Sequence, residues 1–106
     1  MNKVIDLQKI ADELEFDIED VEMLMGVFVE SARESLETLK VAIEHNDEEK
    51  ILNAAHAIKG SAANLTLVDI ASLAKTLETK VREKEELDYL SIYSELNELV
   101  NNIQCI

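Results

Sequence analysis

The chain has 106 residues, a formal net charge of −13 at pH 7, no proline and two glycines. This length fits one domain with a hydrophobic core, and we treat residues 1–106 as that domain. Nucleic acids and anionic membranes both attract clustered Lys and Arg, so the charge argues against either partner. Leucine, alanine, glutamate and lysine are plentiful and strand-like alternation is missing, which indicates an all-α fold.

Five segments have apolar residues at helical spacing. We expect a short first helix over residues 4–14. An acidic stretch from Asp17 opens a long second helix that ends near His45. Its expected inward positions are Val21, Leu24, Met25, Phe28, Ala32, Leu36, Leu39 and Ile43. Within it, Gly26 costs about 1 kcal/mol relative to alanine, and close helix packing is one explanation for its presence.

The third helix is expected over residues 48–65, with Asn46 or Asp47 as its cap. Thr66 begins a capping-box-like restart into the fourth helix. The expected inward positions of this helix are Ile70, Leu73, Ala74, Leu77 and Val81. A charged turn over 82–86 precedes a fifth helix, whose expected stripe is Leu90, Tyr93, Leu96, Val100 and Ile103. Such short loops predict an up-down antiparallel four-helix bundle, with the short first helix capping one end.

His56 is the most informative residue of the third helix, because Lys59 and Gly60 share its helical face at i+3 and i+4. On a wheel of about 100° per residue, the apolar positions gather on one side: Ile51, Ala54, Ala55, Ile58, Ala62 and Leu65. His56 lies roughly 160° from the centre of that stripe and is expected to point outward. The other residues of its face are small or apolar apart from one lysine: Leu52, Lys59, Gly60 and Ala63. Such a face suits close approach by another protein.

An exposed neutral imidazole is a nucleophile that needs no separate base. Attack of His56 on a phosphoryl group would form phosphohistidine, and Lys59 would neutralise charge on the phosphoryl oxygens. Gly60 would leave room for an incoming active site, and Ser61 would either donate a hydrogen bond or bond back to the helix backbone. Taken singly, these residues have ordinary explanations: a surface histidine, a solvated lysine and a C-cap glycine. Their joint occurrence favours a phosphoryl site.

The run from His56 to Ala62, His-Ala-Ile-Lys-Gly-Ser-Ala, resembles the signature of histidine-containing phosphotransfer (HPt) domains. That signature is histidine, any residue, a hydrophobic residue, lysine, glycine and two small residues. The likeness includes Asn64-Leu65 and residues 28–39 and 73–78, and it covers about residues 18–100. Thr66 departs from the pattern, because family members usually have glycine there. The resemblance makes residues 1–106 one HPt-like four-helix-bundle domain.

This resemblance implies a phosphorelay intermediate. His56 would take a phosphoryl group from the aspartyl phosphate of a receiver domain and pass it to another receiver. Response-regulator receivers and a hybrid histidine kinase would be its partners, docking over Leu52, Ser61, Ala63 and Asn64. Such family members bind no ATP and have no autokinase activity, so no cofactor or metal is expected on this chain. The catalytic aspartate and Mg²⁺ would belong to the partner receiver.

Two other interpretations stay open: a non-catalytic helical adaptor, and the phosphotransfer module of a larger chemotaxis-type kinase. Met1 and Ile106 at the ends favour a free-standing protein. A ferritin-like di-metal enzyme is rejected because neither histidine follows a glutamate by three residues. His45 fits a favourable charge at a helix C-terminus, and Cys105 has no second cysteine to pair with. Without a signal peptide or a long apolar run, we expect a cytoplasmic monomer.

Overall fold

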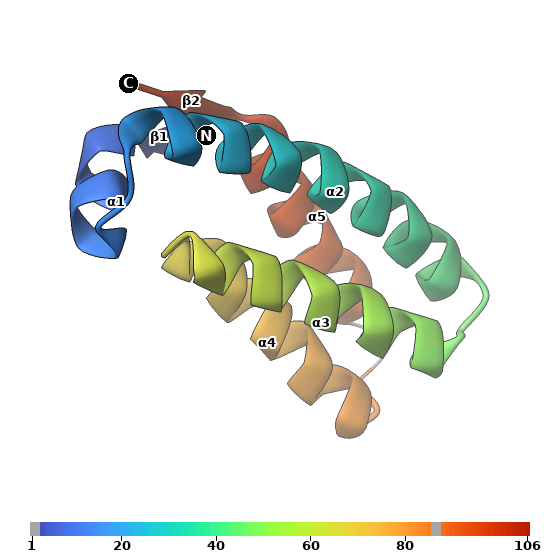
Figure 1. Ribbon diagram of the computed structural model, residues 1–106. Coiled ribbons are helices and arrows are strands. Elements are labelled where there is room, and N and C mark those ends of the chain that lie inside the picture. Colours follow the sequence, from blue (N-terminus) through green and yellow to red (C-terminus); the bar gives the residue numbers. More distant parts are fainter. Residues whose placement is uncertain (1–2, 86–87) are drawn as a thin grey trace.

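The computed structural model describes residues 3–85 and 88–106, which form five helices and two short strands (Figure 1). In chain order these are β1 (Lys3–Ile5), α1 (Leu7–Leu14), α2 (Ile18–Glu44), α3 (Glu48–Asn64), α4 (Val68–Arg82), α5 (Tyr89–Asn101) and β2 (Ile103–Cys105). The long helices fall where the sequence predicts them, with ends within a few residues of the expected ones.

The four long helices pack as a bundle. Helix α2 contacts α3 and α5, and α4 contacts the same two helices, so the four close into a ring around one core. The helical-bundle class predicted from the sequence is confirmed. The up-down antiparallel order of the helices stays a prediction. The fully buried large side chains are Leu36, Leu39, Ile51, Ile58, Ile70, Leu77, Val81, Tyr89, Leu96, Val21 and Val100.

The two ends of the chain are joined by a small sheet that the sequence did not predict. Strand β1 pairs in parallel with β2, with Lys3 opposite Ile103 and Ile5 opposite Cys105. The expected helix over 4–14 is therefore wrong at its start, because Asp6 caps α1 by accepting a hydrogen bond from the Lys9 amide at 3.2 Å. Three residues are too few for the alternation of exposed Val4 and buried Ile5 to be recognised as a strand.

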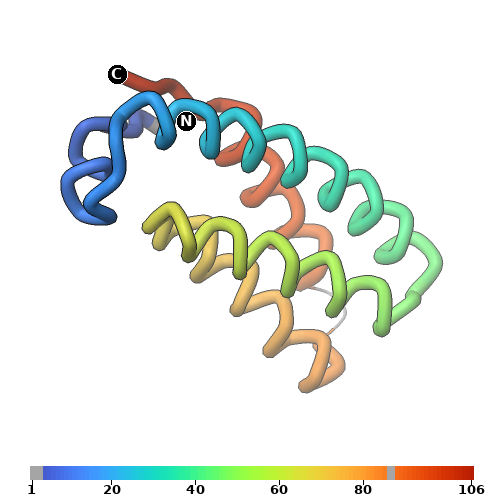
Figure 2. Tube along the Cα trace, in the orientation of Figure 1, coloured from blue at the N-terminus to red at the C-terminus, as the bar shows by residue number. Residues whose placement is uncertain are grey.

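Helix α1 lies at the end of the bundle where α2 begins (Figure 2). Leu7, Ile10 and Ala11 are its buried residues and join the main core. The expectation that this short helix caps one end is confirmed.

Two predicted inward stripes are partly wrong. In α5 the buried positions are Tyr89, Ile92, Leu96 and Val100. Leu90 is 58% exposed, and Ile103 lies beyond the helix in β2. In α2, Leu24 is 36% exposed while Ala42 is buried. Both helices carry apolar residues on more than one face, so periodicity alone could not choose which face packs inward.

The turn between α3 and α4 depends on Thr66, which has a φ of 57°. A β-branched residue in this left-handed region is strained, and glycine adopts it at no steric cost. The N-cap of α4 is Leu67, which makes no side-chain cap hydrogen bond. The expectation that Thr66 caps α4 is therefore wrong.

The remaining local expectations have mixed outcomes. Asp47 is the N-cap of α3, as expected, and accepts a hydrogen bond from the Lys50 amide at 3.2 Å. A Cβ at Gly26 would meet nothing within 4 Å, so close packing does not explain this glycine. The turn expected over 82–86 begins directly after α4, and its last residue, 86, lies outside the described part. Among the described residues, no helix combines the length and apolar character needed to cross a bilayer.

Candidate functional site

Helix α3 fixes the direction in which His56 points. Ile51, Ala55, Ile58 and Ala62 of α3 are buried against the other helices, as predicted. The opposite face looks outward, and the His56 side chain is 72% exposed there. The predicted outward orientation of His56 is confirmed, so the imidazole is accessible to a partner.

Glu78 of α4 is the buried charged residue beside this histidine, and its residue exposure is 3%. Its Oε1 lies 2.7 Å from Nζ of Lys59, and this short ion pair joins α3 to α4. The Lys59 side chain is 33% exposed, so the lysine is not the solvated residue that the sequence alone suggested.

An imidazole and a guanidinium approach the other oxygen of the same carboxylate. His56 Nδ1 lies 3.6 Å from Glu78 Oε2, and Arg82 Nη2 lies 3.8 Å from it. Arg82 follows Glu78 by four residues and therefore shares its face of α4. The cations of two helices thus converge on one buried negative charge, as a buried carboxylate requires.

Sequence reasoning missed Glu78, although a signal was present. It follows Ala74 by four residues and precedes Val81 by three, so it lies on the inward stripe of α4. A glutamate is almost never fully buried without a partner. An acid in that register therefore indicates a cation on a neighbouring helix.

Gly60 and Ser61 follow His56 along α3. A Cβ added at Gly60 would meet nothing within 4 Å, so the helix surface beside the histidine is open. The Ser61 hydroxyl donates to the Ala57 carbonyl at 2.9 Å, which is the backbone-bonded arrangement that the sequence left as one option.

The residues predicted to dock a partner lie in different environments. Ala63 and Asn64 are exposed. Leu52 is half-buried and packs against the core, so its expected full exposure is wrong. Ser61 and Asn64 border a groove between α3 and the start of α2, and we call it the α2–α3 groove. Its lining residues are Phe16, Leu24, Val27, Phe28, Ser31, Ser61, Asn64 and Leu65.

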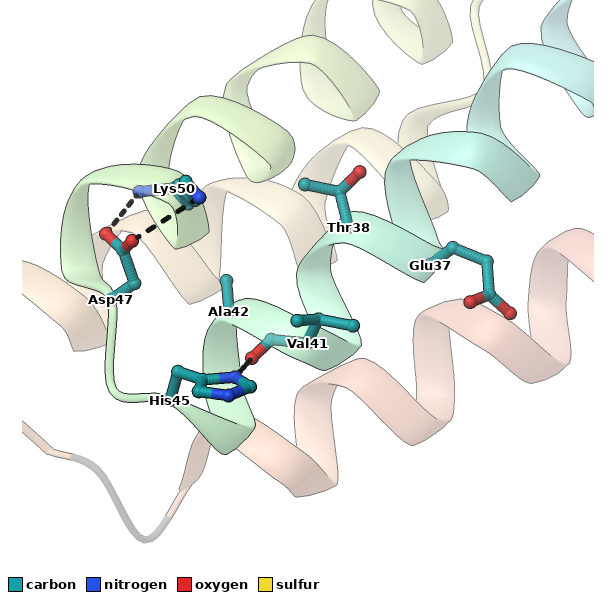
Figure 3. Close-up of a pocket in the computed structure, with 7 residues that line it drawn as sticks. All are labelled: Glu37, Thr38, Val41, Ala42, His45, Asp47 and Lys50. Carbon is teal, nitrogen blue, oxygen red and sulfur yellow. Dashed lines mark hydrogen bonds and ion pairs between the residues drawn. The ribbon is translucent and has the colours of Figure 1, made fainter.

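The second histidine, His45, lies elsewhere, at the C-cap of α2 (Figure 3). Its Nδ1 is 2.9 Å from the Val41 carbonyl, which fits the expected role at a helix C-terminus. The surface pocket beside it includes Asp47 and Lys50, which pair with each other at 3.9 Å. Neither a lysine nor a glycine stands in the positions after His45 that Lys59 and Gly60 occupy after His56.

No cluster of three or more His, Cys, Asp or Glu side chains suited to a metal ion occurs within residues 3–85 and 88–106. The absence of a cofactor on this chain stays a prediction. The site combines an accessible histidine, a lysine and an arginine paired with a buried carboxylate, and an open helix face.

The family model for the Hpt domain matches residues 23–104, and the chain therefore belongs to the Hpt domain family. Membership supports a role in histidine phosphotransfer within a phosphorelay. The crystal structure of histidine-containing phosphotransfer protein B (HptB) from Pseudomonas aeruginosa PAO1 has the same fold, with a TM-score of 0.77 and 23% identity over 90% of this chain and 80% of that one. Comparison with curated proteins finds no match.

Proposed function

We propose that His56 is the phosphorylated residue of this Hpt domain. It accepts a phosphoryl group from the aspartyl phosphate of a receiver domain and passes it to another receiver. The observation that carries this proposal is the 72% exposed His56 side chain, with its Nδ1 facing the buried Glu78 carboxylate. That orientation turns the opposite ring nitrogen, Nε2, toward an incoming partner.

The transfer is a single displacement at phosphorus, in which one bond forms as another breaks. The Nε2 lone pair forms the new N–P bond while the P–O bond to the partner's aspartate breaks, and the aspartate leaves as a carboxylate. The imidazole ring becomes positively charged as its lone pair is used. Glu78 stabilises this charge through Nδ1, as an oriented carboxylate does for a catalytic histidine.

Arg82 and Lys59 give the site a positive field that favours the approach of an anionic phosphoryl group, while Lys59 itself stays paired with Glu78. The partner receiver is expected to contribute the acceptor or donor aspartate and a bound Mg²⁺. This chain then acts as a carrier, without ATP binding, autokinase activity or a metal of its own. We expect it to act as a monomer.

The α2–α3 groove is the proposed docking surface for the receiver. Phe16 is 48% exposed, Leu24 is 36% exposed and Val27 is 59% exposed. Ser61 and Asn64 connect this apolar surface to the His56 helix. Apolar side chains grouped beside an accessible nucleophile favour protein docking over binding of a small ligand.

The test is incubation of the protein with a phosphorylated receiver domain, followed by detection of a label that is acid-labile and base-stable. The variant His56→Gln is expected to remain unlabelled. The variant His45→Gln is the matched control, since it removes the other histidine, and it should be labelled like the wild type. Equal labelling of wild type and His56→Gln would refute the proposal.

A non-catalytic adaptor remains the second candidate, because the exposed apolar residues of the α2–α3 groove would serve any docking contact. It predicts receiver binding with no label on either histidine. The same experiment, run with a binding measurement, therefore separates the two functions.

A further inference from the structure

Lys59 has two competing partners once His56 is phosphorylated. In the unmodified protein its ammonium lies 2.7 Å from Oε1 of Glu78. It also follows His56 by three residues, within reach of a phosphoryl group on that side chain. A phosphoryl group brings close to two negative charges and three acceptor oxygens to the site. The position of one ammonium group thus decides which anion is neutralised.

The buried Glu78 carboxylate is expected to bind Lys59 more strongly than the phosphoryl group does. Glu78 is 3% exposed, so water compensates little of its charge. His56 Nδ1 and Arg82 Nη2 lie 3.6 Å and 3.8 Å from Oε2, each farther from it than Lys59 is from Oε1. These groups come from α3 and α4, and Lys59 makes the shortest of the three contacts. The phosphoryl group, in contrast, projects into solvent from an exposed side chain.

We propose that Glu78 is a positioning residue that withholds Lys59 from the phosphoryl group and so keeps the phosphohistidine short-lived. This inference rests on the proposed function of His56. A phosphoryl group that Lys59 does not neutralise is more readily given up, which suits a carrier that must pass it on. Glu78 therefore acts on the lifetime of the intermediate through Lys59.

The step concerned is loss of the phosphoryl group to water. Water oxygen bonds to phosphorus while the P–Nε2 bond breaks, the electron pair returns to the imidazole ring, and the products are the free histidine and inorganic phosphate. Neutralisation of the phosphoryl oxygens by Lys59 stabilises the phosphorylated state before this step. Removal of the Glu78 charge frees Lys59 and is expected to slow the loss.

The experiment loads the full-length protein with phosphoramidate. His56 Nε2 attacks its phosphorus, the P–N bond of the donor breaks, and ammonia leaves. After the donor is removed by gel filtration, decay of phosphohistidine is followed by ³¹P NMR. The variant Glu78→Gln is expected to decay about threefold more slowly, the effect of one partly exposed ion pair. Glu83→Gln removes an exposed acid at the end of the same helix and should decay like the wild type.

A double-mutant cycle with Lys59→Met distinguishes a positioning role from a structural one. In the Lys59→Met background, Glu78→Gln should no longer lengthen the lifetime. An unchanged lifetime in Glu78→Gln, or an equal lengthening in both backgrounds, would overturn the inference. If Glu78→Gln does not fold, Glu78→Asp can replace it, because aspartate keeps the charge but its shorter side chain withdraws it from Lys59. A phosphohistidine lifetime in Glu78→Asp equal to that of the wild type would overturn the inference. Failure of the wild type to acquire phosphohistidine on His56 would refute the proposed function instead.

Discussion

Replacing Lys59 with methionine is expected to destabilise the bundle, although the lysine borders solvent. The substitution keeps most of the apolar stem and removes the ammonium that lies 2.7 Å from Glu78 Oε1. The carboxylate stays buried at 3% exposure, with the His56 imidazole at 3.6 Å and the Arg82 guanidinium at 3.8 Å as its next neighbours. The folded state therefore retains a buried charge without its main partner. A solvated lysine, as the sequence alone suggested, would leave stability almost unchanged.

The size of the effect follows from the exposure of the two partners. Breaking a fully buried ion pair costs about 3–5 kcal/mol, whereas an exposed pair contributes about 1 kcal/mol or less. Lys59 is 33% exposed and Arg82 compensates part of the charge, so the expected loss is about 2 kcal/mol. For a domain of this size, that loss lowers Tm by roughly 10 °C.

Urea unfolding followed by far-UV circular dichroism measures this loss as a change in the free energy of unfolding. Lys40→Met, at an exposed position on α2, is the control and should stay within about 0.5 kcal/mol of wild type. Glu78→Gln should lose less than Lys59→Met, because it leaves cations that can turn toward water. A loss in Lys59→Met no larger than that of the control would refute the argument.

Three further predictions concern other positions. Gly60→Gln and Gly26→Gln should each raise the free energy of unfolding by about 0.5–1 kcal/mol. Only Gly60→Gln should slow phosphoryl transfer, and equal transfer rates in the two variants would contradict the proposal that the open surface beside His56 admits the partner. Val27→Glu should lower kcat/KM for transfer with a receiver about tenfold, which is the loss expected when one valine is no longer buried at the interface. Val41→Glu, on an exposed part of α2 beside His45, is the control and should leave kcat/KM unchanged, and equal effects of the two variants would place docking elsewhere. Thr66→Gly should relieve about 1–2 kcal/mol of left-handed backbone strain and lose about 0.5–1 kcal/mol to chain entropy. Urea unfolding should therefore report a small increase in the free energy of unfolding, and a decrease would show that Thr66 is not strained.

The third helix was predictable because its sequence carries one unambiguous apolar stripe. Ile51, Ile58 and Leu65 are separated by seven residues each, so the direction of His56 follows from the helical period alone. The N-cap of this helix was narrowed to Asn46 or Asp47, because either side chain before a helix can satisfy an amide of its first turn, and the structure selects Asp47.

Other features depend on contacts that no local pattern encodes. Leu90 and Ile92 are both apolar, and the face of α5 that packs inward is decided by the neighbouring helices. The partners of Glu78 come from another helix, so its charge cannot be matched to Lys59 without the fold. Strands β1 and β2 have only three residues each, and each exists because the other is present.

The parallel pairing of β1 with β2 has a consequence for the order of folding. Lys3 faces Ile103, and the Leu7 amide donates to the Ile106 carbonyl at 3.1 Å, so almost the whole chain lies within the loop that this ladder closes. Closing so long a loop by random search has a high entropic cost, which the assembled bundle removes by holding both ends in place. We therefore expect the ladder to form after the bundle has assembled. Because the ladder anchors α1, and Phe16 comes two residues after α1, one lining residue of the α2–α3 groove is positioned with the help of a contact to the other end of the chain.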